Sequence, residues 1–394
     1  MPFFTKIQAQ SVISESLFTD NYNIEPEKSG TLGLNIDNIS FLHNIETNGD
    51  IFQGYTLPGL RINPRLVYQP TEIIKLEAGL SLLRYWGADK YPNYAYQDIS
   101  EWKADGYQYG FHVLPFFRAQ IQPIPQVNIV LGHIYGGSTH GLIEPLYNPE
   151  LNLTADPETG AQFLYNSRVA HFDTWVNWES FTFRNDTHNE VVTVGNSTCF
   201  HITSPQSFFY LGIPFQALVV HHGGEIDINP EGTLTLANGS AGLRFGFNID
   251  NDILRHVGLD IMGAGYTANF TKVPLFYDQG WAVYSNLNFQ IHDFNLEMTI
   301  WRSGDFVNLY GSPVFGNVST AVEGRNFPRT LVYNPRLKYE HEFGSGYHIG
   351  ARVEYFHNPR LLGYDSYIPL ENINSFNWVS GVYLRINPSI IFNK

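Results

Sequence analysis

The stretch SFFYLGIPFQALVV, residues 207–220, alternates along the chain with a period of two. On one face fall Phe209, Leu211, Ile213, Phe215, Ala217 and Val219. Tyr210, Gly212 and Gln216 fall on the opposite face. This period is typical of a β-strand, because successive side chains in a strand point to opposite sides of the sheet.

The same alternation recurs in GFHVLPFFRAQI (110–121), GWAVYSNLNFQI (280–291) and YHIGARVEYF (347–356). It predicts about sixteen strands, an even number as expected for a single-chain bacterial barrel. The predicted ranges are 36–46, 58–68, 72–85, 107–120, 127–136, 160–168, 170–182, 190–202, 207–220, 232–247, 254–267, 280–291, 294–303, 329–342, 346–357 and 375–392.

Composition indicates where these strands lie. Of the 394 residues only 15% are charged, where about 25% is typical, and 15% are aromatic. No stretch approaches the roughly 20 apolar residues of a membrane-spanning helix, and the mean hydropathy is −0.18. Few charges, many aromatic residues and no long apolar run together are typical of a transmembrane β-barrel, whose lipid-facing side chains occupy every second position.

The connections between predicted strands alternate between short and long. The short ones include QPT (69–71), ITSPQ (202–206), HD (292–293) and GSG (344–346). The long ones include residues 87–106, 138–160 and 305–328. Short periplasmic turns and long extracellular loops are the pattern of an up-and-down barrel. A soluble β-sandwich, the alternative for many short strands, gives no reason for such alternation.

Two similar sequence segments occur near the two ends of the predicted barrel, GLRINPRLVYQP at 59–70 and LRINPSIIFNK at 384–394. In a closed barrel the first and last strands pair, which removes the sheet edges. Proline cannot donate to the ladder, so we expect Pro64, Pro335 and Pro388 at bulges or where pairing ends.

The alternating closing strand NWVSGVYLRINPSIIF (377–392) resembles the C-terminal signal of porin-like outer-membrane barrels of Gram-negative bacteria, although Asn393 and Lys394 follow Phe392. YWGADKYPNYAYQD (85–98) and NPELNLTADPETG (148–160) are similar in style to uncharacterised Bacteroidetes-type barrels. The resemblance implies an outer-membrane location, membrane lipid as surroundings and the barrel assembly machinery as partner during insertion.

We expect residues 36–394 to form the barrel and residues 1–35 to form a separate N-terminal segment. The first ten residues read either as a signal-peptide remnant or as an ordered terminus. The polar stretch from Ser11 to Thr31 has no barrel period, so it either plugs the lumen or lies in the periplasm.

Charged side chains on the inner faces are the candidates for selectivity. They are Arg61, Arg65, Arg118, Arg336, Lys338, Glu340, Arg352, Glu354 and Arg385. Two interpretations stay open. The arginines form a basic track for carboxylate or phosphate groups, or arginine and glutamate pair across strands and fill the lumen.

The preferred function is an outer-membrane channel for passive or weakly selective passage of small hydrophilic solutes. The alternative is a plugged barrel, an accessory subunit of an export, assembly or nutrient-capture complex. Possible partners are further copies of the chain or other outer-membrane proteins. The net charge of −14 disfavours nucleic acid.

Enzyme chemistry is not expected, because no Gly-x-Ser-x-Gly motif occurs and Ser138 with His140 has no discernible partner. The sequence also predicts no cofactor and no metal. HHGGE (221–225) is the strongest metal candidate, but it lacks further ligands at zinc spacing, and Cys199 stands alone.

Overall fold

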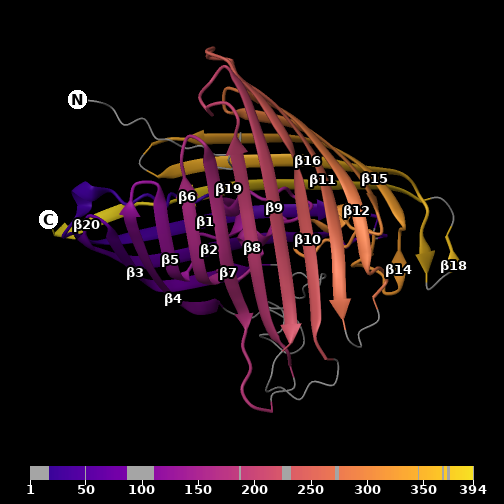
Figure 1. The fold of residues 1–394 in the computed structure, drawn as a ribbon, viewed down its shortest axis with the longest axis horizontal. Helices are drawn as coiled ribbons and strands as arrows, with labels where there is room; N and C mark the ends of the chain where they lie inside the picture. Colours follow the sequence, from indigo (N-terminus) through magenta and orange to yellow (C-terminus); the bar gives the residue numbers. More distant parts are fainter. Residues whose placement is uncertain are drawn as a thin grey trace.

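The computed structural model describes residues 17–48, 50–86, 111–185, 188–223, 232–270, 275–344, 346–365, 368–370 and 373–393. These residues form a closed antiparallel barrel of sixteen strands, with the last strand written as two segments (Figure 1). No described helix is long and apolar enough to cross a membrane.

The barrel strands keep consecutive antiparallel order from β1 to the closing strand. Their bounds are β1 (Leu32–Glu46), β2 (Tyr55–Thr71), β3 (Ile74–Tyr85), β4 (His112–Ile124), β5 (Val127–His133), β6 (Thr159–Asn166), β7 (Ala170–Ser180), β8 (Glu190–His201), β9 (Phe209–Gly223), β10 (Leu234–Asn248), β11 (Leu254–Phe270), β12 (Gln279–Ile291), β13 (Phe294–Gly304), β15 (Arg329–Glu342), β16 (Tyr347–Leu361), β19 (Ile373–Ile386) and β20 (Ser389–Asn393).

The long connections carry the remaining elements. They are η3 (Gly137–His140), α2 (Leu151–Thr154), η4 (Pro313–Phe315) and a small sheet of β14 (Arg325–Asn326), β17 (Tyr364–Asp365) and β18 (Ile368–Pro369). A single turn, η1 (Pro26–Lys28), precedes β1. The predicted alternation of short and long connections is therefore confirmed for the described residues. The loop predicted at 87–106 lies outside them.

The predicted closure is confirmed by the pairing of β1 with both β2 and the last strand. Phe41 lies opposite Tyr383 in β19, and Leu34 lies opposite Ile390 in β20. Asn38↔Ile386 and Asn35↔Ser389 keep one register across the break at Pro388. The prediction for this proline is therefore confirmed, because pairing pauses where the backbone donor is missing.

Pro64 and Pro335 also interrupt strand pairing, each with only one of the two neighbouring strands. Pro64 stays opposite Ile36 of β1, whereas the ladder with β3 passes from Ile62 directly to Arg65. Pro335 stays opposite Met298 of β13, and its ladder with β16 lacks the corresponding pair.

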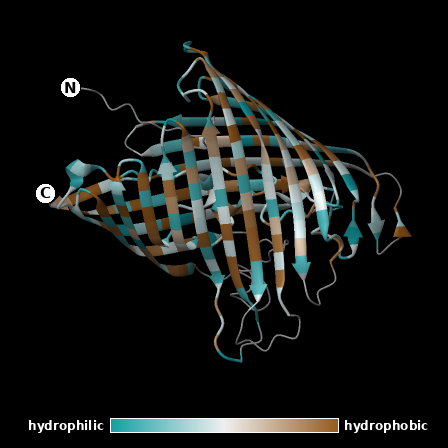
Figure 2. Cartoon of the chain, in the orientation of Figure 1, coloured by the Kyte–Doolittle hydropathy of each residue, from teal (hydrophilic) through white to brown (hydrophobic). Residues whose placement is uncertain are grey.

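The two faces of the wall separate by polarity, as Figure 2 shows by the bands along the strands. In β9, Phe209 and Phe215 are exposed on the outer face, whereas Tyr210, Gln216 and Leu218 are buried inside. A large apolar outer surface without a covering layer is what a lipid-facing band requires. The alternation that predicted the fold is thus the alternation between lipid and lumen.

The N-terminal boundary differs slightly from expectation, since β1 begins at Leu32 rather than at residue 36. Ahead of it, Leu17 and Ile24 are buried and the Asp20 side chain contacts Arg385 of the wall. The division into a segment and a barrel stays a prediction, and residues 1–16 lie outside the described range.

Candidate functional site

Two long connections fold into the lumen and meet there. One runs from β5 to β6 and carries η3 and α2. The other runs from β13 to β15 and carries η4. The Asn148 backbone N–H donates to the carbonyl of Tyr310 at 2.7 Å, and the Ser312 N–H donates to that of Glu144 at 3.2 Å. The outer part of the lumen is therefore occupied by chain.

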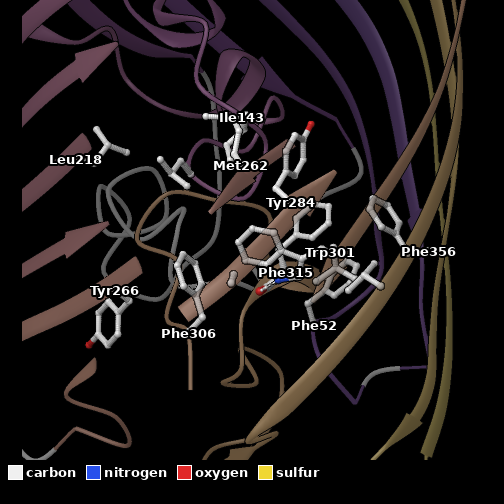
Figure 3. Close-up of a cluster of buried hydrophobic side chains, with 14 of the residues drawn as sticks. Phe52, Ile143, Leu218, Met262, Tyr266, Tyr284, Trp301, Phe306, Phe315 and Phe356 are labelled. Atoms are coloured by element: carbon white, nitrogen blue, oxygen red, sulfur yellow. Dashed lines mark hydrogen bonds between the residues drawn. The ribbon is translucent and has the colours of Figure 1, made fainter. Parts of the chain in front are cut away.

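An apolar cluster holds the second of these connections against the wall (Figure 3). Trp301 of β13 packs edge-on to Phe306 and Phe315, with ring centroids 5.1 and 5.8 Å away. Its indole N–H donates to the Phe315 carbonyl at 2.9 Å. Phe356 of β16 closes the cluster against Phe315. Burial of these rings stabilises the inward position, at roughly 1.5–3 kcal/mol per large side chain.

On the C-terminal wall the predicted charged residues form an ion-pair network. Arg336 contacts Glu354 at 2.6 Å, Glu297 at 3.0 Å and also Glu144 of the inserted connection. Lys338 reaches Glu297 at 3.1 Å. All but the glutamate from the connection belong to neighbouring strands, so the period of two brings them together.

Arg352 extends the same network. Its guanidinium pairs with Glu354 of its own strand and lies 3.5 Å from Glu144. Glu340 is half-buried near the short-turn end of β15, where its backbone N–H donates to the Asp293 carbonyl at 2.9 Å.

At the closing seam, Arg385 of β19 binds Asp37 of β1 at 2.9 Å, Asp20 at 2.6 Å and the carbonyls of Leu17 and Thr19 at 3.0 Å each. Because Asp20 lies in the segment before β1, this arginine fastens that segment inside the barrel. Burial opposes ionisation of Asp20, but the Arg385 charge outweighs it and lowers the pKa of that carboxyl to about 2.

The remaining arginines are also engaged. Arg118 binds Glu77 at 2.9 Å. Arg65 lies 3.8 Å from Glu77 and 3.9 Å from Asp37. Arg61 donates to the carbonyl of Ala155. The contacts match the paired interpretation from the sequence, and a selectivity role for the nine residues stays a prediction.

Histidine–carboxylate pairs are the groups in the lumen that are suited to proton transfer. His140, the residue that sequence reasoning considered beside Ser138, binds Asp173 through Nδ1 at 2.7 Å and Glu158 through Nε2 at 3.1 Å. Burial disfavours its charge, but the two carboxylates outweigh burial and raise the pKa of His140 to about 9. Its ring also stacks on Trp175, with centroids 3.4 Å apart.

With both nitrogens occupied, His140 cannot take a proton from Ser138. The Ser138 hydroxyl instead accepts a hydrogen bond from the Asn152 amide at 2.7 Å. This arrangement ties the inserted connection to β7 and is structural.

His43 of β1 is different. Its Nδ1 lies 3.1 Å from the Tyr383 hydroxyl, and its Nε2 lies 3.6 Å from Glu150 Oε2. The ring is buried, and Nε2 has no hydrogen-bond partner among the described residues. Tyr55 donates to the other oxygen of Glu150 at 2.6 Å, which orients the carboxylate.

A cavity of about 20 Å³ opens beside this pair and is also lined by Ser312, Arg352 and Glu354. That volume accommodates one water molecule, and the lining provides several polar partners for it. A base, a carboxylate beside it and a guanidinium thus surround a space the size of one water.

Sequence reasoning missed this group, because His43, Glu150 and Ser312 come from β1 and from two separate loops. Their spacing matches no motif, and only the inward folding of the loops brings them together. His221 and His222 of HHGGE do not converge, since they pair with Thr235 and Leu234 as successive residues of β9 and point to opposite faces. No group of three or more potential ligands is arranged for a metal among the described residues.

Solved structures with similar folds are outer-membrane proteins. OmpT from Vibrio cholerae is 8% identical, with 90% of this chain and 99% of that chain covered and a TM-score of 0.46. An anion-selective porin from Comamonas acidovorans is 8% identical, with 90% and 100% covered and a TM-score of 0.47. OccK1 (OpdK) from Pseudomonas aeruginosa is 9% identical, with 91% and 98% covered and a TM-score of 0.48. Similarity at these values carries no functional argument.

No curated protein matches the chain by sequence. A family model described as lipid A 3'-O-deacylase-type matches residues 24–394. The match and the barrel establish an outer-membrane location, as predicted, whereas the likeness to Bacteroidetes-type barrels stays a prediction.

The prediction that the chain is not an enzyme is wrong, because the matching family is defined by an enzyme activity. The absence of a Gly-x-Ser-x-Gly motif excluded only one architecture for ester hydrolysis. With 24–394 of 394 residues matched, this outer-membrane barrel belongs to the lipid A 3'-O-deacylase-type family.

Proposed function

We propose that this chain is an outer-membrane hydrolase that removes an ester-linked acyl chain from a lipid A-type glycolipid. The family match supports the reaction class. The observation that carries the assignment of a site is the His43–Glu150 pair, whose unpartnered Nε2 lies beside a single-water cavity.

The cavity supplies the groups that hydrolysis of an ester needs. His43 takes a proton from the bound water as the water oxygen attacks the acyl carbonyl carbon. The Tyr383 hydroxyl at Nδ1 orients the imidazole, and Glu150, 3.6 Å from Nε2, stabilises the imidazolium that forms. The Arg352 guanidinium stabilises the developing oxyanion. When the acyl C–O bond breaks, His43 returns the proton to the sugar oxygen, which leaves a free hydroxyl and a fatty acid.

Access to this cavity requires movement of chain, because 20 Å³ does not accommodate an acyl ester. Phe52 and Pro313, from the β1–β2 and β13–β15 connections, both line it. Both connections lie at the long-loop end of the barrel. The proposed approach of the substrate is therefore from the outer leaflet, with displacement of these connections.

Mass spectrometry of lipid A from cells that express the chain tests the proposal. Expression of the wild type should produce a lipid A species lacking one ester-linked acyl chain. His43→Ala should lower its rate of formation by about 10²–10⁴-fold, the usual contribution of a general base. His341→Ala is the matched control, since His341 also pairs with a carboxylate, Asp293 at 2.8 Å, but at a short turn.

Folded protein must be confirmed for each variant by heat-dependent gel mobility. Unchanged lipid A in cells that contain folded wild-type protein would contradict the hydrolase proposal. Equal loss in the His43 and His341 variants would remove the assignment of the site.

A channel is the second candidate, favoured by two polar cavities in the N-terminal part of the lumen. They measure about 110 and 260 Å³ and share Asp20, Arg65 and Arg118 in their linings. A polar route past this cluster would pass solutes if the inserted connections moved. Single-channel conductance in a planar bilayer tests it. Discrete steps with anion preference that Arg65→Ala abolishes would support a selective pore, and a folded barrel without conductance would exclude one.

A further inference from the structure

The outer face of β1 interrupts the lipid-facing band. Inward positions of this strand are Ile39, Phe41, His43 and Ile45, all buried, so the even-numbered residues face outward. From the middle of the strand to its outer end these are Asn38, Ser40, Leu42, Asn44 and Glu46. Four of these five side chains are polar, on a surface where most exposed large side chains are Leu, Ile, Phe, Val and Trp.

Neighbouring strands widen this polar surface. Asn44 lies opposite Ser380 of β19 on one side and Thr56 of β2 on the other. The Thr56 hydroxyl donates to Asn44 Oδ1 at 2.5 Å. We call the six residues the seam patch, because they lie along the closure of the barrel. Its members are Asn38, Ser40, Asn44, Glu46, Thr56 and Ser380.

Asn38 shows that the seam patch is incomplete within one chain. It is flanked by Ile386 and Ile62, and its side-chain oxygen is buried without a hydrogen-bond partner among the described residues. An unsatisfied amide is costly in hydrocarbon, and such residues within a membrane usually face a polar partner.

The outer face of β7 and β8 provides the contrast. Thr174, Asn196 and Thr198 also point outward there, but they satisfy one another. The Asn196 amide donates to Thr174 at 2.7 Å, and Thr198 donates to Asn196 Oδ1 at 3.0 Å. Outward polar side chains of this barrel can therefore satisfy their hydrogen bonds with one another, whereas the Asn38 side-chain oxygen has no such partner among the described residues.

From these observations we infer that the seam patch is the contact surface between two copies of this chain in the membrane. Asn38 lies at the seventh of the fifteen positions of β1, near the middle of the strand, whereas lipid headgroups lie near the ends of a membrane-spanning strand. Asn and Ser each donate and accept, so the patch is complementary to itself across a two-fold axis. Exposed Leu42, Trp378 and Val382 beside it supply apolar packing.

Cysteine cross-linking in native membranes tests the contact. In a Cys199→Ser background, which removes the one native thiol, Ser40→Cys should give a disulfide-linked dimer on oxidation. Ala237→Cys, at an outward position of β10, is the matched control and should stay monomeric. Cross-linking at Ser40 no greater than at Ala237, or only to a different protein, would overturn the proposal.

The role of the polar groups is tested by Asn38→Leu, which keeps volume and suits lipid. Native mass spectrometry of the detergent-extracted protein should show dimers for the wild type and at least a tenfold weaker dimer for the variant. Asn196→Leu should leave the dimer unchanged. A dimer of undiminished stability in Asn38→Leu, or equal weakening in both variants, would overturn the assignment to the seam patch.

Discussion

His140 and His43 are both buried in the lumen, and both lie beside carboxylates, yet their surroundings differ in one respect. His140 has a carboxylate on each ring nitrogen. His43 has one, at 3.6 Å, and a tyrosine hydroxyl on the other side. A histidine with a carboxylate on both nitrogens fixes a loop and has no free nitrogen to accept a proton, whereas one with an unsatisfied nitrogen beside a cavity can act on a bound molecule.

His140→Ala should give the largest effect on stability. The substitution leaves Asp173 and Glu158 as buried carboxylates without their common partner, and breaking such an arrangement costs about 3–5 kcal/mol. The free energy of unfolding of the refolded barrel, measured in urea, should fall by that amount. His43→Ala serves as comparison and should cost less, because it leaves a single carboxylate already bound by Tyr55. Equal losses would show that the two sites do not differ in kind.

Alkaline pH should reproduce part of that loss without mutation. The pKa of His140 is raised from 6.5 to about 9 by the Asp173 and Glu158 charges. Its contribution is therefore fully present below about pH 6.5 and is lost as the pH rises through about 9. The shift corresponds to about 3 kcal/mol. Unfolding measured between pH 7 and pH 10.5 should show this decline in the wild type and a smaller one in His140→Ala. Parallel declines in both would contradict the role given to His140.

Glu150→Gln tests the comparison of His43 with His140 through catalytic rate instead of stability. The amide keeps the shape of the carboxylate but no longer stabilises an imidazolium on His43, so deacylation should fall about 10–100-fold. Glu158→Gln, at the clamped histidine, should lower stability and leave the rate per folded molecule unchanged. The readout is the ratio of lipid A species normalised to folded protein. A rate lost only in Glu158→Gln would place the chemistry at His140 instead.

Ser312→Ala should give the smallest effect. Its hydroxyl offers one neutral hydrogen bond to a molecule in the cavity, worth about 0.5–1.5 kcal/mol, so deacylation should fall about tenfold or less. Abolished activity in a folded Ser312→Ala variant would instead make the serine a nucleophile, and the water-attack route would be wrong.

Much of the fold was predictable from local pattern. The period of two located the strands, as in β9, and the order of short and long connections fixed the up-and-down topology. The repeated Asn-Pro phrase pointed to the closing seam, where Pro388 interrupts the last strand. Strand ends were less accurate, as at Leu32 and Tyr55, because the ends of a pairing depend on the partner strand as well as on the segment itself.

The candidate site was not predictable in this way. The charged residues of the walls were identified, since Arg336 and Glu354 follow the strand period and pair with each other, but the contact of Arg336 with Glu144 required an inserted loop. The enzyme family was missed for the same reason. The nearest sequence clue, Ser138 with His140, pointed to residues that the fold uses as a structural clamp.

The sequence by itself determined that this chain forms a barrel in a membrane, because apolar side chains that face lipid alternate with side chains that face the lumen along each strand. Only the tertiary structure decided what fills the barrel. Whether the 134–158 and 305–328 connections point outward or inward depends on contacts such as Trp301 with Phe315 and Asn148 with Tyr310. Those contacts join residues more than a hundred positions apart or on opposite sides of a turn, and no local pattern encodes them.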